Sequence, residues 1–164
     1  VNQGSRFTVA LPWRVPSGST APLAPAVDAP LSAPPYPPEA DLPLALIADD
    51  HELVTTSLTQ LLLAQGIRTI VVKDGADAIE KATLLLPALL LIDMQLPLLD
   101  DKAMLRALRN NIHLQTTPVI AMSALLWPGS EQQYLTAGAS AYVGKPIGAK
   151  QLQQLLKQWL PPAR

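Results

Sequence analysis

The segment Leu89-Leu90-Leu91-Ile92-Asp93 is an uninterrupted apolar run that ends in a carboxylate. Two more runs share this character, Leu44–Ala48 before Asp49 and Val119–Met122 before Ser123. Continuous apolar runs of this length are typical of strands buried on both faces of a parallel sheet. The pattern therefore predicts an α/β protein in which a polar side chain follows each buried strand.

Segments of helical length separate these runs and two weaker ones, with Gly66 and Gly138 as stop signals. The additional strands are expected over Ile67–Val72 and Ala141–Val143, and the helices over Glu52–Gln65, Ala76–Leu86, Lys102–Asn110, Ser130–Ala137 and Ala149–Leu160. Strands and helices then alternate strictly. Right-handed crossovers convert this alternation into a doubly wound, five-stranded parallel sheet flanked by five helices.

Ligands of a doubly wound sheet bind at the carboxyl ends of the strands. The polar residues expected at that edge are Asp49, Asp50, Asp93, Ser123 and Lys145. Three carboxylates packed closely raise one another's pKa, and a hard divalent cation such as Mg²⁺ relieves their repulsion. A carboxylate left free beside Mg²⁺ and a lysine can attack phosphorus and form an aspartyl phosphate.

Four strings at these positions carry a resemblance to a known family: Ala48-Asp49-Asp50-His51, Leu91-Ile92-Asp93-Met94-Gln95-Leu96-Pro97, Pro118-Val119-Ile120-Ala121-Met122-Ser123-Ala124 and Tyr142-Val143-Gly144-Lys145-Pro146-Ile147. In this order and spacing, the chain from Leu44 to Trp159 resembles the receiver domain of two-component response regulators. The resemblance implies a flavodoxin-like fold with strand order 2-1-3-4-5.

The resemblance also implies a role for each site residue. Asp93 matches the phospho-accepting aspartate, and Mg²⁺ would be held by Asp49, Asp50, Asp93 and the backbone carbonyl of Gln95. Lys145 matches the lysine that pairs with a phosphoryl oxygen, and its bond to Pro146 matches a peptide that is usually cis. Ser123 and Tyr142 match the hydroxyl and the aromatic ring that move together on activation. Phosphorylation would then remodel the face formed by the fourth helix, the fifth strand and the fifth helix.

Four further residues carry separate expectations. Asp101 stands where the family usually has glycine, a residue that accepts a positive φ more readily than aspartate does. Leu125 and Trp127 follow Ser123, and we hypothesise that they shield the acyl phosphate from water. His51 is expected to be a capping or surface residue at the start of the first helix.

Residues 1–43 are predicted to be organised differently from the receiver, which would occupy residues 44–164. Ten of the 17 prolines lie between Pro12 and Pro43, so residues 12–43 are predicted to form an extended, semi-rigid linker. Residues 1–11 alternate like a strand through Phe7, Val9 and Leu11. They resemble the closing strand of a histidine-kinase ATP-binding domain. We therefore expect the chain to be a piece of a hybrid histidine kinase, although the kinase motifs themselves are missing from it.

Composition excludes several other functions. The 164 residues carry a net charge of −1, which argues against sequence-independent nucleic-acid binding. The absence of cysteine excludes disulfides, thiolate catalysis and cysteine-ligated zinc. The longest apolar run, Leu84 to Ile92, is too short to cross a bilayer, so we expect a cytoplasmic location and no membrane contact, although a parent kinase could itself be membrane-anchored.

Three functions remain after these exclusions. The first is a receiver that accepts a phosphoryl group from a phosphohistidine, carried by a histidine-phosphotransfer domain or by kinase dimerisation helices. Such a receiver itself catalyses its phosphorylation and a slow autodephosphorylation. The second is a Mg²⁺-dependent aspartyl phosphatase of haloacid-dehalogenase type, in which the nucleophile would lie on the first strand. The third is a degenerate receiver that serves only for docking.

Overall fold

The computed structural model describes residues 42–97 and 100–160. The predicted strand within residues 1–11 lies outside this part, and so does the predicted linker over residues 12–43 apart from its last two residues. The carbonyls of those two residues, Leu42 and Pro43, accept hydrogen bonds from the side chain and the backbone of Arg68. Among the described helices, none has the length and apolar character needed to cross a membrane.

Five strands and five helices alternate along the chain, as the sequence predicts. Their order is β1 (Leu44–Ala48), α1 (Glu52–Leu63), β2 (Arg68–Val72), α2 (Gly75–Leu85), β3 (Leu89–Asp93), α3 (Asp101–Asn110), β4 (Val119–Ser123), α4 (Ser130–Ala137), β5 (Ala141–Gly144) and α5 (Ala149–Trp159). All strand pairs are parallel, in the order β2-β1-β3-β4-β5. The expected strand order is confirmed.

The register brings the last residues of neighbouring strands to one edge of the sheet. Ala48 lies opposite Val72 on β2 and opposite Ile92 on β3, and Ser123 on β4 lies opposite Gly144 on β5. Because the chain direction across the sheet reverses after β2, β1 and β3 border the topological switch point, where doubly wound proteins bind ligands. We call this edge of the sheet the carboxyl edge.

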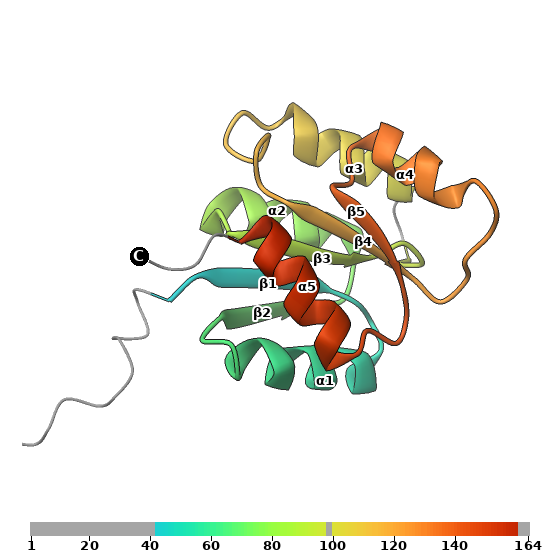
Figure 1. Cartoon of the computed structure of the whole chain (residues 1–164). Helices are drawn as coiled ribbons and strands as arrows, with labels where there is room; N and C mark the ends of the chain where they lie inside the picture. The colour runs from blue at the N-terminus through green and yellow to red at the C-terminus, as the bar shows by residue number, and fades with distance from the viewer. Residues whose placement is uncertain (1–41, 98–99, 161–164) are drawn as a thin grey trace, which may run out of the picture. The chain divides into compact units, whose positions relative to one another are not determined.

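Helices cover both faces of the sheet (Figure 1), and an apolar core lies beneath each layer of helices. One core packs α1 and α5 against β1, β3 and β4 through leucines that include Leu58, Leu62 and Leu152. The other packs α2, α3 and α4 against the opposite face, with Met104 and Leu108 fully enclosed. The central strands β3 and β4 are buried throughout, which is why their sequences show no polar alternation.

Helix ends follow the local stop signals, with small differences from the expected bounds. α1 ends at Leu63, two residues before its predicted end, and Gly66 then adopts a left-handed φ of 73°. α2 ends at Leu85 because Leu86 takes a left-handed conformation ahead of Pro87, which cannot continue a helix. Both helix ends lead into the next strand, β2 and β3, and neither difference alters the topology.

Candidate functional site

The carboxyl edge collects the polar residues that the sequence singles out. Asp49 follows β1, Asp93 is the last residue of β3, and Ser123 is the last residue of β4. Lys145 follows β5 directly. Both aspartates are fully buried and Ser123 is nearly so. Residues far apart in the sequence are thus brought to one place by the parallel topology.

Lys145 joins the two buried carboxylates. Its Nζ lies 2.6 Å from Asp49 Oδ2 and 2.7 Å from Asp93 Oδ2. Within the part of the chain that the structure describes, neither Oδ2 atom accepts a hydrogen bond of good geometry. Both oxygens therefore keep lone pairs for a further cation. The peptide bond between Lys145 and Pro146 is cis, as the resemblance implies.

Two tight turns fix the orientation of the buried carboxylates. The backbone N–H of Gln95 donates to Asp93 Oδ1 at 3.1 Å, and the backbone N–H of His51 donates to Asp49 Oδ1 at 2.9 Å. A carboxylate that accepts from the N–H two residues later forms an Asx turn, which holds its side chain in one rotamer. Each aspartate thus gives one oxygen to its own loop and presents the other to Lys145.

Asp50 and Gln95 are the remaining predicted metal residues. The side chain of Asp50 is 42% exposed, and it forms a group with Asp49, His51 and Asp93 whose potential ligand atoms all lie within 4.8 Å of one another. The side chain of Gln95 is exposed at the rim of a nearby cavity. The expected role of the Gln95 carbonyl as a metal ligand stays a prediction.

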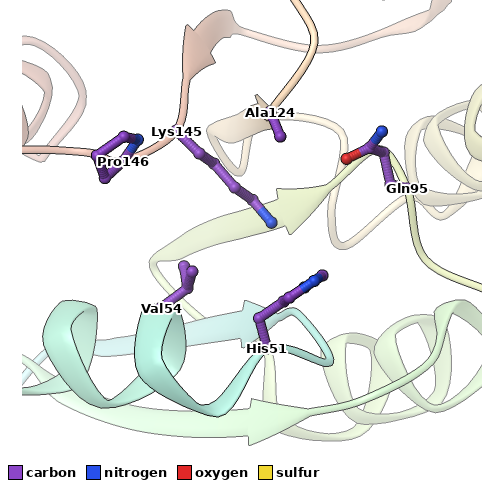
Figure 2. Close-up of a pocket in the computed structure, with 6 residues that line it drawn as sticks. All are labelled: His51, Val54, Gln95, Ala124, Lys145 and Pro146. Atoms are coloured by element: carbon purple, nitrogen blue, oxygen red, sulfur yellow. The ribbon is translucent and has the colours of Figure 1, made fainter.

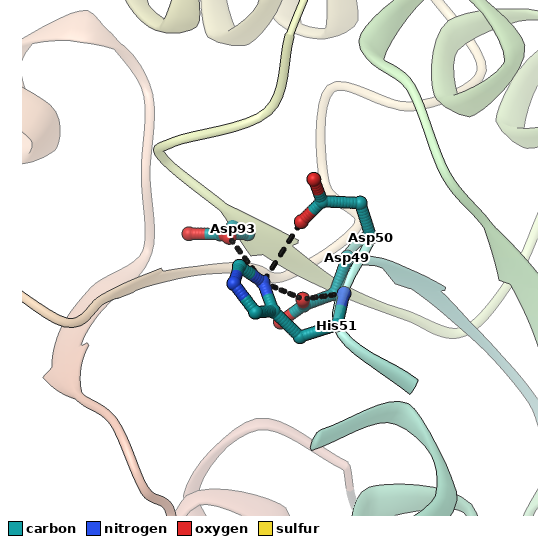
Figure 3. A group of neighbouring side chains, drawn as sticks. All are labelled: Asp49, Asp50, His51 and Asp93. Atoms are coloured by element: carbon teal, nitrogen blue, oxygen red, sulfur yellow. Dashed lines mark hydrogen bonds and ion pairs between the residues drawn. The ribbon is translucent and has the colours of Figure 1, made fainter. Parts of the chain in front are cut away.

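His51 is a site residue that sequence reasoning missed. It is the N-cap residue of α1, as expected, but its side chain makes no capping hydrogen bond. The ring turns instead toward the carboxylates, with Nδ1 2.8 Å from Asp50 Oδ1 and 3.2 Å from Asp49 Oδ1 (Figure 3). The signal available in the sequence was its position directly after two acidic residues.

The donor set of this edge fits a hard divalent cation. Three carboxylates face a single ammonium, so two negative charges remain uncompensated when His51 is neutral. Two of these carboxylates are fully buried, where a net negative charge is most costly. Carboxylate and carbonyl oxygens are the ligands that Mg²⁺ prefers. Asp49, Asp50 and Asp93 are therefore suited to hold it.

Ser123 and Tyr142 are tied to a single backbone atom. The Ser123 hydroxyl donates to the carbonyl of Leu125 at 2.9 Å, and the Tyr142 hydroxyl donates to the same carbonyl at 3.0 Å. The N–H of Leu125 in turn donates to Ser123 Oγ at 3.1 Å. The two predicted switch residues thus share an anchor in the loop between β4 and α4.

The side chains of Leu125 and Trp127, in the same loop, are 50% and 67% exposed. The hypothesis that they shield the acyl phosphate from water stays a prediction.

Tyr142 is also linked to α3 through a second aromatic ring. Its ring stacks on that of Tyr134 in α4, with centroids 5.1 Å apart, and the Tyr134 hydroxyl donates to Asp101 Oδ2. Burial, and then the hydrogen bond to Asp101, raise the pKa of Tyr134 above its ordinary value. Asp101 is the first residue of α3 and does not adopt a positive φ. The replacement of the family glycine therefore imposes no strain at this residue.

A cavity of about 290 Å³ opens beside the carboxylates. Figure 2 shows Lys145 reaching toward it from the end of β5 and His51 from the start of α1. Its other lining residues include the apolar side chains of Val54, Ala124 and Pro146. The cavity therefore combines an apolar wall with the ammonium of Lys145 and the polar side chains of His51 and Gln95.

Comparison with known proteins gives one consistent family. Residues 45–157 match the family described as the response regulator receiver domain. The chain is 31% identical over 118 residues to the polar-differentiation response regulator DivK of Brucella anthropi, an alignment that covers 72% of this chain and 96% of that protein.

Two solved structures extend the comparison to three dimensions. The receiver domain of the sensor histidine kinase PA1611 from Pseudomonas aeruginosa PAO1, with a magnesium ion coordinated in its active site cleft, is 29% identical. Its TM-score is 0.66, and the match covers 71% of this chain and 96% of that one. The chemotaxis protein CheY4 of Vibrio cholerae is 21% identical with a TM-score of 0.68, and the match covers 73% of this chain and 99% of that one. At this identity the likeness supports the fold alone.

Proposed function

The chain belongs to the response regulator receiver family of two-component signalling, and from this premise we propose that Asp93 accepts a phosphoryl group from a phosphohistidine. The observation that carries the proposal is the buried Asp93 carboxylate, which is held by Lys145 on one oxygen and by the Gln95 N–H on the other. A buried carboxylate fixed in this way is positioned for attack rather than for solvation.

The proposed reaction transfers the phosphoryl group from nitrogen to oxygen. An oxygen of Asp93 forms a bond to phosphorus while the bond between phosphorus and the donor imidazole breaks. The imidazole nitrogen takes up a proton from solvent, and Asp93 becomes an acyl phosphate. Lys145 already lies 2.7 Å from Asp93 Oδ2, so its ammonium can follow the charge onto a phosphoryl oxygen.

The acidic residues have a separate task in this proposal. Mg²⁺, when bound, would neutralise charge on the carboxylates and on the transferred phosphoryl group. Asp49, Asp50 and Asp93 would hold it, together with the carbonyl of Gln95. The Asx turns at Asp49 and Asp93 keep the carboxylates oriented before any cation arrives, so little reorganisation is required.

The shared anchor at Leu125 supports the proposed switch. When the Ser123 hydroxyl turns toward a phosphoryl oxygen, the Leu125 carbonyl loses one of its two hydroxyl donors. The loop between β4 and α4 is then free to move, and Tyr142 moves with it. Charge at Asp93 thereby biases a two-state element on the face of α4, β5 and α5.

We propose that the donor is a histidine-phosphotransfer domain or the dimerisation helices of a histidine kinase. The cavity beside Lys145, with Val54, Ala124 and Pro146 on its walls, offers an apolar surface for such a helix. A link to a hybrid kinase is consistent with the receiver of the Pseudomonas sensor kinase among the relatives.

Intact-mass spectrometry after incubation with acetyl phosphate and Mg²⁺ tests this function. We expect a gain of one phosphoryl group in the wild type and no gain in Asp93→Asn or in the presence of EDTA. Absence of any gain at saturating Mg²⁺ would overturn the proposal in favour of a docking-only receiver. Repeated turnover of small phosphate esters would instead indicate the haloacid-dehalogenase type of phosphatase, although the Asp that would act as nucleophile is on β3 and not on the first strand.

A further inference from the structure

The imidazole of His51 lies among the groups that are suited to hold a cation. Figure 3 shows the ring between the carboxylates of Asp49, Asp50 and Asp93, with dashed lines from Nδ1 to each. The site is therefore not an all-oxygen site. A neutral imidazole nitrogen is a ligand that favours nickel, copper, zinc or iron over magnesium.

The distances between these atoms match those of ligands around one small cation. Neighbouring ligands of an octahedral ion with bonds of about 2.1 Å are about 3.0 Å apart, and opposite ligands are about 4.2 Å apart. His51 Nδ1 lies 2.8 Å from Asp50 Oδ1, 3.2 Å from Asp49 Oδ1 and 4.0 Å from Asp93 Oδ2. The first two separations correspond to neighbouring positions and the third to opposite positions.

The buried oxygens provide an independent indication that the group can accept a cation. Asp49 and Asp93 are fully buried and share the single ammonium of Lys145, whose Nζ lies 2.6 and 2.7 Å from their Oδ2 atoms, so this pair of carboxylates keeps an excess of negative charge. The imidazole side is accessible, because the His51 side chain is 64% exposed. A cation can thus enter past His51 and meet the buried carboxylates behind it.

We propose that His51 Nδ1 is a ligand for a late first-row divalent cation of the Ni²⁺ class in this pocket, and that Mg²⁺ binds there through oxygen atoms alone. The proposal rests on the proposed function, because it uses the same carboxylates. It adds a property that the carboxylates alone do not give, which is a preference between two classes of cation. Affinity for a mixed nitrogen and oxygen site rises steeply toward Ni²⁺ and Cu²⁺ along the first row.

Isothermal titration calorimetry with Ni²⁺ and with Mg²⁺ tests the proposal on the full chain without an affinity tag. The variants are His51→Ala and His51→Asn, and the matched control is His113→Ala, since the chain has only two histidines and His113 is exposed. We expect His51→Ala to weaken Ni²⁺ binding at least tenfold and to change Mg²⁺ binding less than about threefold. His51→Asn offers an amide oxygen in place of the nitrogen, so it is expected to lose Ni²⁺ affinity as well. His113→Ala is expected to change neither.

Nuclear magnetic resonance of the two imidazole rings supplies a second readout. Paramagnetic Ni²⁺ at substoichiometric amounts is expected to broaden the ring signals of His51 and to leave those of His113 sharp. Ni²⁺ affinity that is unchanged in His51→Ala would overturn the proposal, and so would an equal loss of Ni²⁺ and Mg²⁺, which indicates a structural role.

The failures of the two proposals are distinguishable. A wild type that binds Mg²⁺ but binds Ni²⁺ no more tightly overturns the role of His51 and leaves the receiver function standing. A wild type that binds neither cation overturns both the role of His51 and the Mg²⁺-dependent chemistry proposed for Asp93.

Discussion

The carboxyl edge of the sheet and the opposite edge, around the half-buried Arg109, pair their charged side chains in contrasting ways. Arg109 donates five hydrogen bonds, to the carbonyls of Gly138, Leu114, Gln115 and Thr117 and to the hydroxyl of Ser140. Burial lowers the pKa of this guanidinium, but its donors are matched by acceptors. At the carboxyl edge, by contrast, the buried carboxylates of Asp49 and Asp93 share one ammonium, and the carboxylate of Asp50 lies beside them.

The difference separates charge that stabilises the fold from charge that is held for chemistry. Arg109 donates hydrogen bonds to the loops that lead into β4 and β5, and all of its acceptors belong to the chain itself. The carboxyl edge keeps an excess of negative charge, so its best partners, a cation and a phosphoryl group, come from outside. Substitutions at the two edges are therefore expected to differ in whether Mg²⁺ reduces the loss of stability and in whether phosphorylation remains.

Lys145→Met is expected to have the largest effect on stability. It leaves Asp49 and Asp93 facing each other without a cation, and loss of one partner of a buried ion pair costs about 3–5 kcal/mol. We expect the unfolding free energy in urea to fall by about this amount in EDTA and by clearly less at saturating Mg²⁺. Lys150→Met, on the exposed side of α5, is the matched control. A loss that Mg²⁺ does not reduce would contradict the account of this edge.

Arg109→Met tests the opposite edge. The substitution keeps the aliphatic stem but removes five hydrogen bonds from a cation, so we expect a loss of about 3 kcal/mol that Mg²⁺ does not restore. Phosphorylation by acetyl phosphate is expected to remain at conditions where the variant is folded. Arg106→Met, on the exposed face of the same helix, is expected to change stability by less than about 0.5 kcal/mol. Equal losses of unfolding free energy in Arg109→Met and Arg106→Met would contradict the stabilising role of the Arg109 hydrogen bonds.

Asp93→Asn is expected to separate function from stability. It abolishes the acyl phosphate, yet it relieves repulsion among three carboxylates, so we expect the unfolding free energy without Mg²⁺ to rise by about 1 kcal/mol at low ionic strength. Urea denaturation in low-salt buffer measures this change. A clear loss of stability would show that Asp93 belongs to the stabilising class of charge.

Tyr134→Phe gives the smallest expected effect and a dependence on pH. Burial, and then the hydrogen bond to Asp101, raise the pKa of Tyr134 above 10, so the unfolded chain loses this proton at a lower pH than the folded one. Stability from this group is therefore present below about pH 10 and falls as the pH rises further. We expect wild-type urea midpoints to fall more steeply above pH 10 than those of Tyr134→Phe. Parallel slopes would contradict the link between α4 and α3.

Much of the fold was predictable because its signals are local. Continuous apolar runs and stop residues located all ten elements to within two residues, and strand ends indicated Asp49, Asp93, Ser123 and Lys145. The direction of the His51 ring was not predictable, because it depends on carboxylates that only the fold brings together.

Other features depend on tertiary contacts for the same reason. The shared anchor at the Leu125 carbonyl and the hydrogen bond from Tyr134 to Asp101 join residues of different elements, and sequence periodicity carries no record of them. The hydrogen bonds of Arg109 likewise depend on two loops that only the fold brings beside it.

Chemical mapping of the phosphoryl group tests the central claim most directly. Borohydride reduces an aspartyl phosphate to homoserine, so treatment of the phosphorylated chain followed by peptide mass spectrometry locates the acceptor. We expect homoserine at position 93 alone. Conversion at Asp49 or Asp50, or no conversion in a sample that has gained a phosphoryl group, would contradict the assignment of Asp93 as the acceptor.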